Sequence, residues 1–200
     1  MIVMAVLAAL AGAVILPALS RPTNCSNRIR CVNNLKQVGL ATRQWAMDHG
    51  DRYPMHTPVA EGGTMDHDRF AEAWVHFVVM SNELNTPKVL ICPEDPLRNE
   101  QWTFATNLSN QDVSYFMGDG AKEEEPATIL AGDRNLTTNG VAVYPGLYTL
   151  DTREVVGWSK SLHELSGNLA FADGSVRQLT SAALQQYLAA NPHTNRLAIP

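Results

Sequence analysis

A histidine and an aspartate near the C-terminus are the first side chains in this sequence that could carry chemistry. Nine residues separate His163 from Asp173, which is followed by Gly174. With a hydroxyl from Ser161 or Ser166, such a pair could form the base and orienting acid of a nucleophilic site. No serine here has the flanking glycines of a nucleophile elbow. We therefore interpret His163, Asp173 and Gly174 as structural, with a turn at Asp-Gly that the histidine hydrogen-bonds, and we predict no enzyme and no catalytic residue.

Three aspartates could bind a metal ion instead. Asp119, Asp133 and Asp173 each stand beside a glycine in an expected turn, where carboxylate oxygens could ligate calcium. The sequence contains no calcium loop of the EF-hand type. Calcium is therefore the one cofactor candidate, and the alternative is that no cofactor binds.

The cysteines are Cys25, Cys31 and Cys92, an odd number that excludes a fully paired disulfide framework. Cys25 and Cys31 would lie on nearly opposite faces of one helix, too far apart to bond. A bridge would therefore join Cys92 to one of them. No cysteines or histidines have the close spacing of a zinc motif, so a structural zinc is not expected.

The N-terminal segment is apolar and reads IVMAVLAALAGAVILPAL over residues 2–19. Its length suits a bilayer core of about 30 Å. A cleaved signal peptide is the alternative, but no lysine or arginine precedes the apolar run. We predict a retained transmembrane helix with a kink at Pro17, where one helical hydrogen bond is lost.

The helical pattern continues after this segment and becomes amphipathic. Over residues 26–48, apolar side chains recur every three or four positions, and His49-Gly50 supplies a stop. The members of this stripe are Ile29, Val32, Leu35, Val38 and Trp45. One side of the predicted helix should therefore pack on the rest of the protein.

The remainder of the chain predicts a small antiparallel sheet flanked by helices, which makes an α+β fold. Two strands around Asp173-Gly174 form a hairpin with both turn residues at positive φ, and a helix follows from Thr180 or Ser181 to about Ala189. A short helix is expected over 68–82, and strands over 88–93, 113–117, 128–131, 141–144, 154–158, 168–172 and 175–179.

The charge balance excludes one class of partner. The formal net charge is -5 at pH 7, and lysines and arginines form no cluster. Binding of nucleic acid phosphates requires such a cluster. We therefore predict no nucleic-acid partner.

Several segments resemble those of type IV pilin-like and pseudopilin proteins, the prepilin-type family. ALAGAVILPALSR followed by CVNNLKQVGLATRQWAMDHGDRYP is similar to the N-terminal cleavage and methylation segment. His163, nine residues and Asp173-Gly174 resemble the prepilin-type processing-associated motif, and Cys92-Pro93 and residues 131–135 also fit this group. The resemblance implies a pilin-like fold, in which a long kinked N-terminal helix with a transmembrane first half packs on a small antiparallel β-sheet head.

This resemblance implies an organisation and a function. Residues 1–22 would be the anchor half of the helix, 23–50 its amphipathic half, and 51–200 the soluble head. The implied disulfide pair is Cys31 and Cys92, and the calcium site in the head of major pseudopilins adds support for calcium.

The implied protein is a single-pass subunit of the bacterial inner membrane with its head in the periplasm. It would serve a type II secretion or type IV pilus-like machine, with membrane lipid, other pilin-like subunits and the assembly platform as partners. The alternatives are a membrane-tethered binding module that does not polymerise and, third, an anchored periplasmic enzyme.

Prepilin-type proteins also begin with a short basic leader that ends before a Phe-Thr-Leu-x-Glu-like start. Here Met1 aligns just after that glutamate, and the basic residues follow the apolar run, which by itself would place the head in the cytoplasm. We expect a leader encoded upstream of Met1, which would restore the periplasmic orientation, and the alternative is that the protein no longer polymerises.

Overall fold

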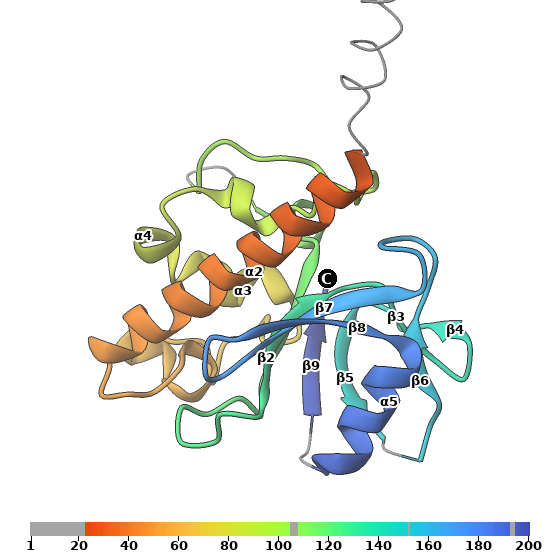
Figure 1. Ribbon diagram of the computed structural model, residues 1–200. Helices are drawn as coiled ribbons and strands as arrows, with labels where there is room; N and C mark the ends of the chain where they lie inside the picture. Colours follow the sequence, from red (N-terminus) through yellow and green to blue (C-terminus); the bar gives the residue numbers. More distant parts are fainter. Residues whose placement is uncertain (1–22, 105–107, 152, 193–194) are drawn as a thin grey trace, which may run out of the picture.

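The computed structural model describes residues 23–104, 108–151, 153–192 and 195–200, with residues 23–25 described by their backbone alone. The first element, α2, spans Thr23–Met47 and lies across one side of the domain (Figure 1). The predicted anchor over 1–22 and the predicted kink at Pro17 lie outside the described residues. Within the described part of the chain, no helix has both the length and the apolar character needed to cross a membrane.

α2 packs on the sheet through one face, although this face differs in part from the predicted stripe. Leu35, Val38 and Trp45 are buried as expected. Ile29 is 57% exposed, so the predicted stripe is wrong at its N-terminal end. The fully buried Cys31 occupies the core position there, one helical turn before Leu35.

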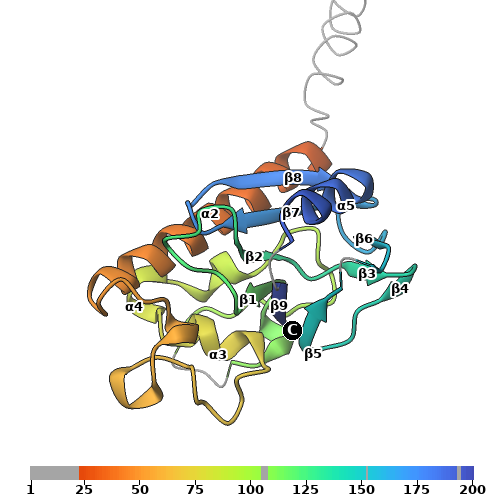
Figure 2. The same ribbon diagram turned by 90° about the horizontal axis from the view of Figure 1, so that it is seen from below.

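The main sheet has six strands in the order β5-β9-β1-β2-β7-β8. Every neighbouring pair is antiparallel. Figure 2 shows α2 running alongside β7 and β8, and α2 contacts β2, β7 and β8. The strands are β1 (Tyr115–Gly118), β2 (Ile129–Asp133), β5 (Gly146–Leu150), β7 (Ser166–Phe171), β8 (Val176–Thr180) and β9 (Asn195–Ile199).

A second sheet and a helix cover the other face of the main sheet. The second sheet has the order β4-β3-β6, formed by β3 (Leu136–Thr138), β4 (Val141–Ala142) and β6 (Val156–Trp158). Helix α5 (Ser181–Ala190) begins at Thr180, whose side chain accepts a hydrogen bond from the backbone N–H of Ala183. This cap is one of the two that the sequence offered.

The main sheet separates two hydrophobic cores, and alternate residues of a strand enter opposite ones. Ala170 and Ala172 face the core beneath α2, whereas Leu169 and Phe171 face the core beneath α5. This alternation is the period of two that a strand dictates. Both faces of β7 are therefore buried, and a polar residue in this strand needs an internal partner.

The segment between α2 and β1 is built from short helices. The helix predicted over 68–82 is instead α3 (Ala73–Val78) and α4 (Ser81–Leu84). The strand predicted over 88–93 begins as a 3₁₀ helix at Pro87–Leu90, because Pro87 fixes φ and the Thr86 side chain caps the turn. Other 3₁₀ helices are Pro54–His56, Val59–Glu61 and Asn110–Asp112.

The β7–β8 hairpin forms where predicted, but its turn differs. Gly174 has φ at 81°, whereas Asp173 has a negative φ, so only one of the two turn residues is left-handed. The backbone N–H of Gly174 donates to the carbonyl of Phe171, and Ser175 donates to the Asp173 carboxylate at 2.8 Å. The connection is longer than two residues, since Ala170 pairs with Val176.

The expected fold class is wrong for the described residues. The domain is mostly antiparallel β, with α2 and several shorter helices around two sheets, and its described part contains no long apolar helix. The predicted sheet was smaller because the segments that form β5 and β9 have no clear local strand pattern, and neither was predicted as a strand. The C-terminal strand β9 instead lies between β5 and β1, inside the sheet.

Candidate functional site

A disulfide between Cys31 and Cys92 lies at the centre of the candidate site. Both cysteines are completely buried, one on α2 and the other just after the 3₁₀ helix Pro87–Leu90. This is the pair that the resemblance implies. Beside it, the Asn34 side chain donates to the carbonyl of Ile91 at 2.9 Å. The disulfide and this hydrogen bond fix the Cys92 loop to α2.

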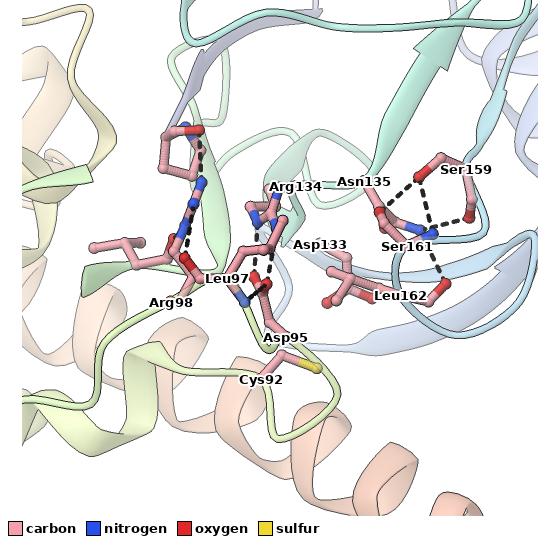
Figure 3. Close-up of polar contacts among 12 residues, drawn as sticks. Cys92, Asp95, Leu97, Arg98, Asp133, Arg134, Asn135, Ser159, Ser161 and Leu162 are labelled. Carbon is pink, nitrogen blue, oxygen red and sulfur yellow. Dashed lines mark hydrogen bonds and ion pairs between the residues drawn. The ribbon is translucent and has the colours of Figure 1, made fainter. Parts of the chain in front are cut away.

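The Cys92 loop is also tied to the end of β2. The carboxylate of Asp95 accepts two hydrogen bonds from the guanidinium of Arg134, both at 2.7 Å (Figure 3). Burial by itself would raise the pKa of Asp95, but its hydrogen bonds and the charge of Arg134 outweigh burial and lower it. The backbone N–H of Asp95 donates to the carbonyl of Cys92 at 2.8 Å. The ion pair therefore holds the cysteine in place.

Asn135 organises the loop that carries His163. Its side-chain Nδ2 lies 3.2 Å from the carbonyl oxygen of Ser159, 3.3 Å from that of Leu162 and 3.2 Å from that of Ser166, so its two N–H groups are shared among three acceptors. Figure 3 shows the contacts with Ser159 and Leu162. A single buried side chain thus fixes both ends of the connection between β6 and β7. This connection is the segment that brings His163 to the disulfide.

The backbone at His163 has an unusual conformation. His163, Glu164 and Leu165 have φ angles of 43°, 48° and 62°. Three consecutive non-glycine residues in the left-handed region cost about 1–2 kcal/mol each. The His163 carbonyl accepts hydrogen bonds from the Arg28 guanidinium and from the Ser166 hydroxyl, which stabilise the turn. This turn could not be predicted from the sequence, because left-handed runs normally contain glycine and residues 163–165 contain none.

The ring of His163 faces the disulfide. Its Nε2 lies 3.3 Å from Sγ of Cys92 and 3.5 Å from Oδ2 of Asp133. The other nitrogen, Nδ1, has no hydrogen-bond partner among the described residues. Burial, assisted by the positive charge of Arg28, lowers the pKa of His163 to about 4. The ring is therefore neutral at pH 7, and its contact with Asp133 is not an ion pair at that pH.

Asp133 at the end of β2 is a buried acid. Its Oδ2 accepts hydrogen bonds from the backbone N–H of Asn168 at 2.7 Å and from the Asn168 side chain at 2.9 Å. Burial raises the pKa of Asp133 to about 7, against the opposing effect of these two hydrogen bonds. Its Oδ1 has no partner within the described structure. Asp133 is thus readily protonated near neutral pH.

The centre has the residue types of a cysteine nucleophile with its base, but not the arrangement. The sulfur of Cys92 is bonded to Cys31 and has no solvent exposure. His163 also meets both Cys92 and Asp133 through the same nitrogen, whereas a catalytic histidine uses opposite nitrogens for its two partners. The geometry therefore supports no nucleophilic catalysis at this centre.

The structure separates the residues that the sequence grouped together. His163 precedes β7 and Asp173 follows it, so the two ends of the motif lie at opposite ends of one strand. The ring of His163 contacts Cys92 and Asp133 instead of the Asp173-Gly174 turn.

The three calcium candidates also have separate partners. The carboxylate of Asp119 binds Arg196, that of Asp133 binds Asn168, and that of Asp173 binds Ser175. They are not part of any converging group of three metal-ligating side chains in the described part of the chain. Asp133 alone belongs to the buried centre.

Comparison with known proteins gives no further guide to this centre. No family model matches the chain, no curated protein matches it, and no solved structure matches it. The pilin-like resemblance therefore stays a prediction.

Proposed function

We propose that this chain is a structural, pilin-like subunit of a type II secretion or type IV pilus-like envelope machine, and that it assembles with other copies through α2. What supports the proposal is a row of exposed apolar side chains on α2. Ile29 is 57% exposed, Leu40 66% and Met47 77%. We call these three residues the outer stripe.

The outer stripe lies along one side of the helix. Its members are 11 and 7 residues apart, which corresponds to about three and two helical turns. Leu35, Val38 and Trp45 point the other way, into the core. Because α2 already buries a complete apolar face, its own fold does not account for the outer stripe. A second helix with the same pattern would bury it by ridge-into-groove packing.

The position of α2 in the chain favours a copy of this protein as the partner. The uncharged run over residues 2–19 precedes α2 directly in the sequence. If several copies gather their apolar N-terminal segments, the α2 helices that follow are brought side by side. The outer stripes then continue the same contact beyond the apolar segment. The head of each copy would then lie on the opposite side of α2 from this contact and would separate neighbouring copies at the surface of the assembly.

The buried centre supports a structural role for the head over an enzymatic one. Cys31, Cys92, Asp133 and His163 are enclosed, with exposures of 1% or less. No substrate can reach them without local opening of the core. An enzyme would need convergent polar groups at an accessible pocket.

Cross-linking of the full chain in membranes tests the proposal. In a Cys25→Ser background, Leu40→Cys and Met47→Cys together place two thiols on the outer stripe. A short thiol-reactive cross-linker should convert this variant into a ladder of multimers. The matched control carries Leu97→Cys and Met65→Cys on the head, at positions 64% and 50% exposed, and should stay mostly monomeric. Equal ladders from both variants, or monomers from both, would refute assembly through α2.

A membrane-tethered binding module is the second candidate, and one surface favours it. Val141 and Tyr144, in and just after the edge strand β4, are 58% and 79% exposed, and Val155, which precedes β6 at the other edge of the same sheet, is 67% exposed. An apolar patch beside an unpaired strand edge is a typical site for a protein partner. Monomers from the cross-linked α2 variant, with the protein still in the membrane fraction, would favour this function over the first.

A further inference from the structure

The convergence of Cys31, Cys92 and His163 is not explained by the subunit role proposed above. The two sulfurs and a ring nitrogen of His163 all lie within 4.8 Å of one another. They come from three segments that are far apart in the sequence: α2, the loop after Pro87–Leu90, and the loop before β7. The fold therefore brings a third donor atom to a disulfide that needs none.

Placing His163 there costs stability. Nδ1 of its buried ring has no partner among the described residues, and an unpaired buried polar group costs about 1–3 kcal/mol. The left-handed backbone of His163, Glu164 and Leu165 adds to that cost. An apolar side chain would fill the same space without the unpaired nitrogen. A strained backbone that presents a buried imidazole is the kind of outlier that points to a site.

The donor set is that of a zinc-class cation. Two thiolates and an imidazole are frequent ligands of tetrahedral zinc, with Zn–S near 2.3 Å and Zn–N near 2.0 Å, which places S and N about 3.5 Å apart. The observed separation of Cys92 Sγ and His163 Nε2 is 3.3 Å. Two thiolates also neutralise a divalent cation, so the occupied site would add no net charge to the core.

We propose that reduction of the Cys31–Cys92 disulfide converts this centre into a three-ligand site for a zinc-class divalent cation, bound by both thiolates and by Nε2 of His163. The centre then has two alternative states, a disulfide when oxidised and a metal site when reduced. Asp133, whose Oδ2 lies 3.5 Å from the same nitrogen, places a carboxyl group next to the cation.

The conversion balances with an external thiol or phosphine as reductant. The reductant supplies two electrons and breaks the S–S bond. Two external thiols are oxidised to their own disulfide and release two protons, or a phosphine takes the oxygen of one water molecule to become a phosphine oxide and that water releases two protons. In either case two protons complete the thiols of Cys31 and Cys92. The cation then displaces both thiol protons into solvent and binds the lone pair of Nε2, while the ring proton stays on Nδ1. A surface hollow of about 400 Å³ is lined in part by Ile91 and Pro93, the two neighbours of Cys92 in the chain. Because both sulfurs are buried, the reductant and the cation reach them by local opening of the core.

Cobalt titration of the full chain, purified in detergent, tests the inference. Co²⁺ bound by thiolates in a tetrahedral site absorbs in the near ultraviolet and visible, whereas hydrated Co²⁺ is nearly colourless. We expect protein reduced with a phosphine to bind one equivalent of Co²⁺ with such a spectrum, and oxidised protein to show none. Reduced protein without this spectrum, or the same spectrum in both forms, would overturn the proposal.

Variants identify the ligands. Cys25→Ser should bind Co²⁺ as the wild type does, whereas Cys31→Ser and Cys92→Ser should each lose the thiolate spectrum. His163→Gln should weaken binding by at least about tenfold, since even partners outside the ligand set contribute that much. Circular dichroism checks that each variant is folded. Unchanged affinity in folded His163→Gln would exclude the histidine as a ligand.

X-ray absorption by the reduced, zinc-loaded wild type needs no variant. We expect a coordination shell of two sulfurs and at least one imidazole nitrogen. A shell of oxygens alone, or of sulfurs without imidazole, would contradict the assignment even where His163→Gln does not fold.

Discussion

At the residue scale, Asn135 shows how one side chain can position a loop. Its two amide N–H groups are shared among the carbonyl oxygens of Ser159, Leu162 and Ser166, and the contacts with Leu162 and Ser166 are buried. Removing the amide leaves these bonds unmade and frees the loop that carries His163. The buried amide therefore contributes to the stability of the fold through several hydrogen bonds at once.

We expect Asn135→Ala to lower the free energy of unfolding by about 2–3 kcal/mol, because buried carbonyls lose their donor. Urea unfolding followed by circular dichroism measures the change. Asn33→Ala, at an exposed position on α2, is the matched control and should change stability by less than about 0.5 kcal/mol. A similar small change in both variants would show that the loop is held by other contacts.

His76 on α3 links stability to pH. Its Nε2 donates to the carbonyl of Phe70 at 2.9 Å, so Nδ1 accepts from the hydroxyl of Thr64 at 2.8 Å. Because one ring nitrogen donates and the other accepts, these two bonds stabilise the neutral form of the ring over the protonated form. Burial lowers the pKa of His76 from 6.5 to about 4, so the unfolded chain takes up the proton first as the pH falls.

Stability due to the neutral His76 ring is therefore complete above about pH 6.5 and is lost as the pH falls toward 4. The loss amounts to at most about 1.4 kcal/mol per pH unit. His76→Gln keeps a donor for Phe70 but cannot titrate. We expect the variant to lose less stability than the wild type between pH 6.5 and 4, as measured by urea unfolding at several pH values. Parallel pH profiles for the two proteins would contradict this prediction.

Sequence reasoning reached part of this residue-scale arrangement. The odd cysteine count and the helical spacing left Cys92 with one partner, either Cys25 or Cys31, and the resemblance pointed to Cys31. The contact of His163 with Cys92 could not be foreseen, because 71 residues separate them and no zinc-like spacing is present. Proximity created by tertiary packing leaves no local pattern in the sequence.

At the scale of elements, glycines determine how closely α2 and the strands approach. Gly39 on α2 lies against Gly174 of the β7–β8 hairpin, and a Cβ there would meet ordinary contacts at 3.7 Å and beyond. Gly167 on β7 is different, since a Cβ would lie 2.5 Å from the ring of Trp158. The same substitution should therefore have opposite effects at the two positions.

Gly39→Ala should raise the free energy of unfolding by up to about 1 kcal/mol, because alanine favours the helix and has room. Gly167→Ala should lower it by about 1–3 kcal/mol, because the new methyl group displaces the Trp158 ring within the core. Thermal and urea unfolding of both variants measure these shifts, with each variant as the control for the other. Destabilisation at both positions would mean that α2 packs closer to the hairpin than described.

Elements with a strong local pattern could be predicted, and those defined by partners could not. The β7–β8 hairpin alternates around Asp173-Gly174, and α5 begins at a capping threonine. β9 is short and follows the end of α5, so nothing local shows that it pairs with both β5 and β1. Strand pairing over such distances is decided by tertiary contacts, which also turned a small head into a six-stranded sheet.

At the scale of the whole molecule, the disulfide is a covalent cross-link between α2 and the Cys92 loop, in addition to the backbone that continues from the end of α2 into the rest of the domain. It closes a loop of 61 residues between Cys31 and Cys92, and loop entropy alone predicts a stabilisation of about 4 kcal/mol. The other contacts of α2 with the sheet are non-covalent, through Leu35, Val38 and Trp45. Reduction should therefore loosen α2 first.

We expect reduction of the wild type to lower the free energy of unfolding by about 3–5 kcal/mol, and the Cys31→Ala, Cys92→Ala double variant to show a similar loss without reductant. Added zinc should then have different effects on the stability of the two proteins. A cation bound only by the folded state stabilises it in proportion to the logarithm of its concentration, so zinc should restore stability to the reduced wild type and leave the double variant unchanged. Urea unfolding at increasing zinc concentrations measures this, with Cys25→Ser as a control that should respond like the wild type. If zinc stabilised the double variant equally, the cation would bind elsewhere on the protein. The disulfide would then be the only cross-link that Cys31 and Cys92 provide between α2 and the Cys92 loop.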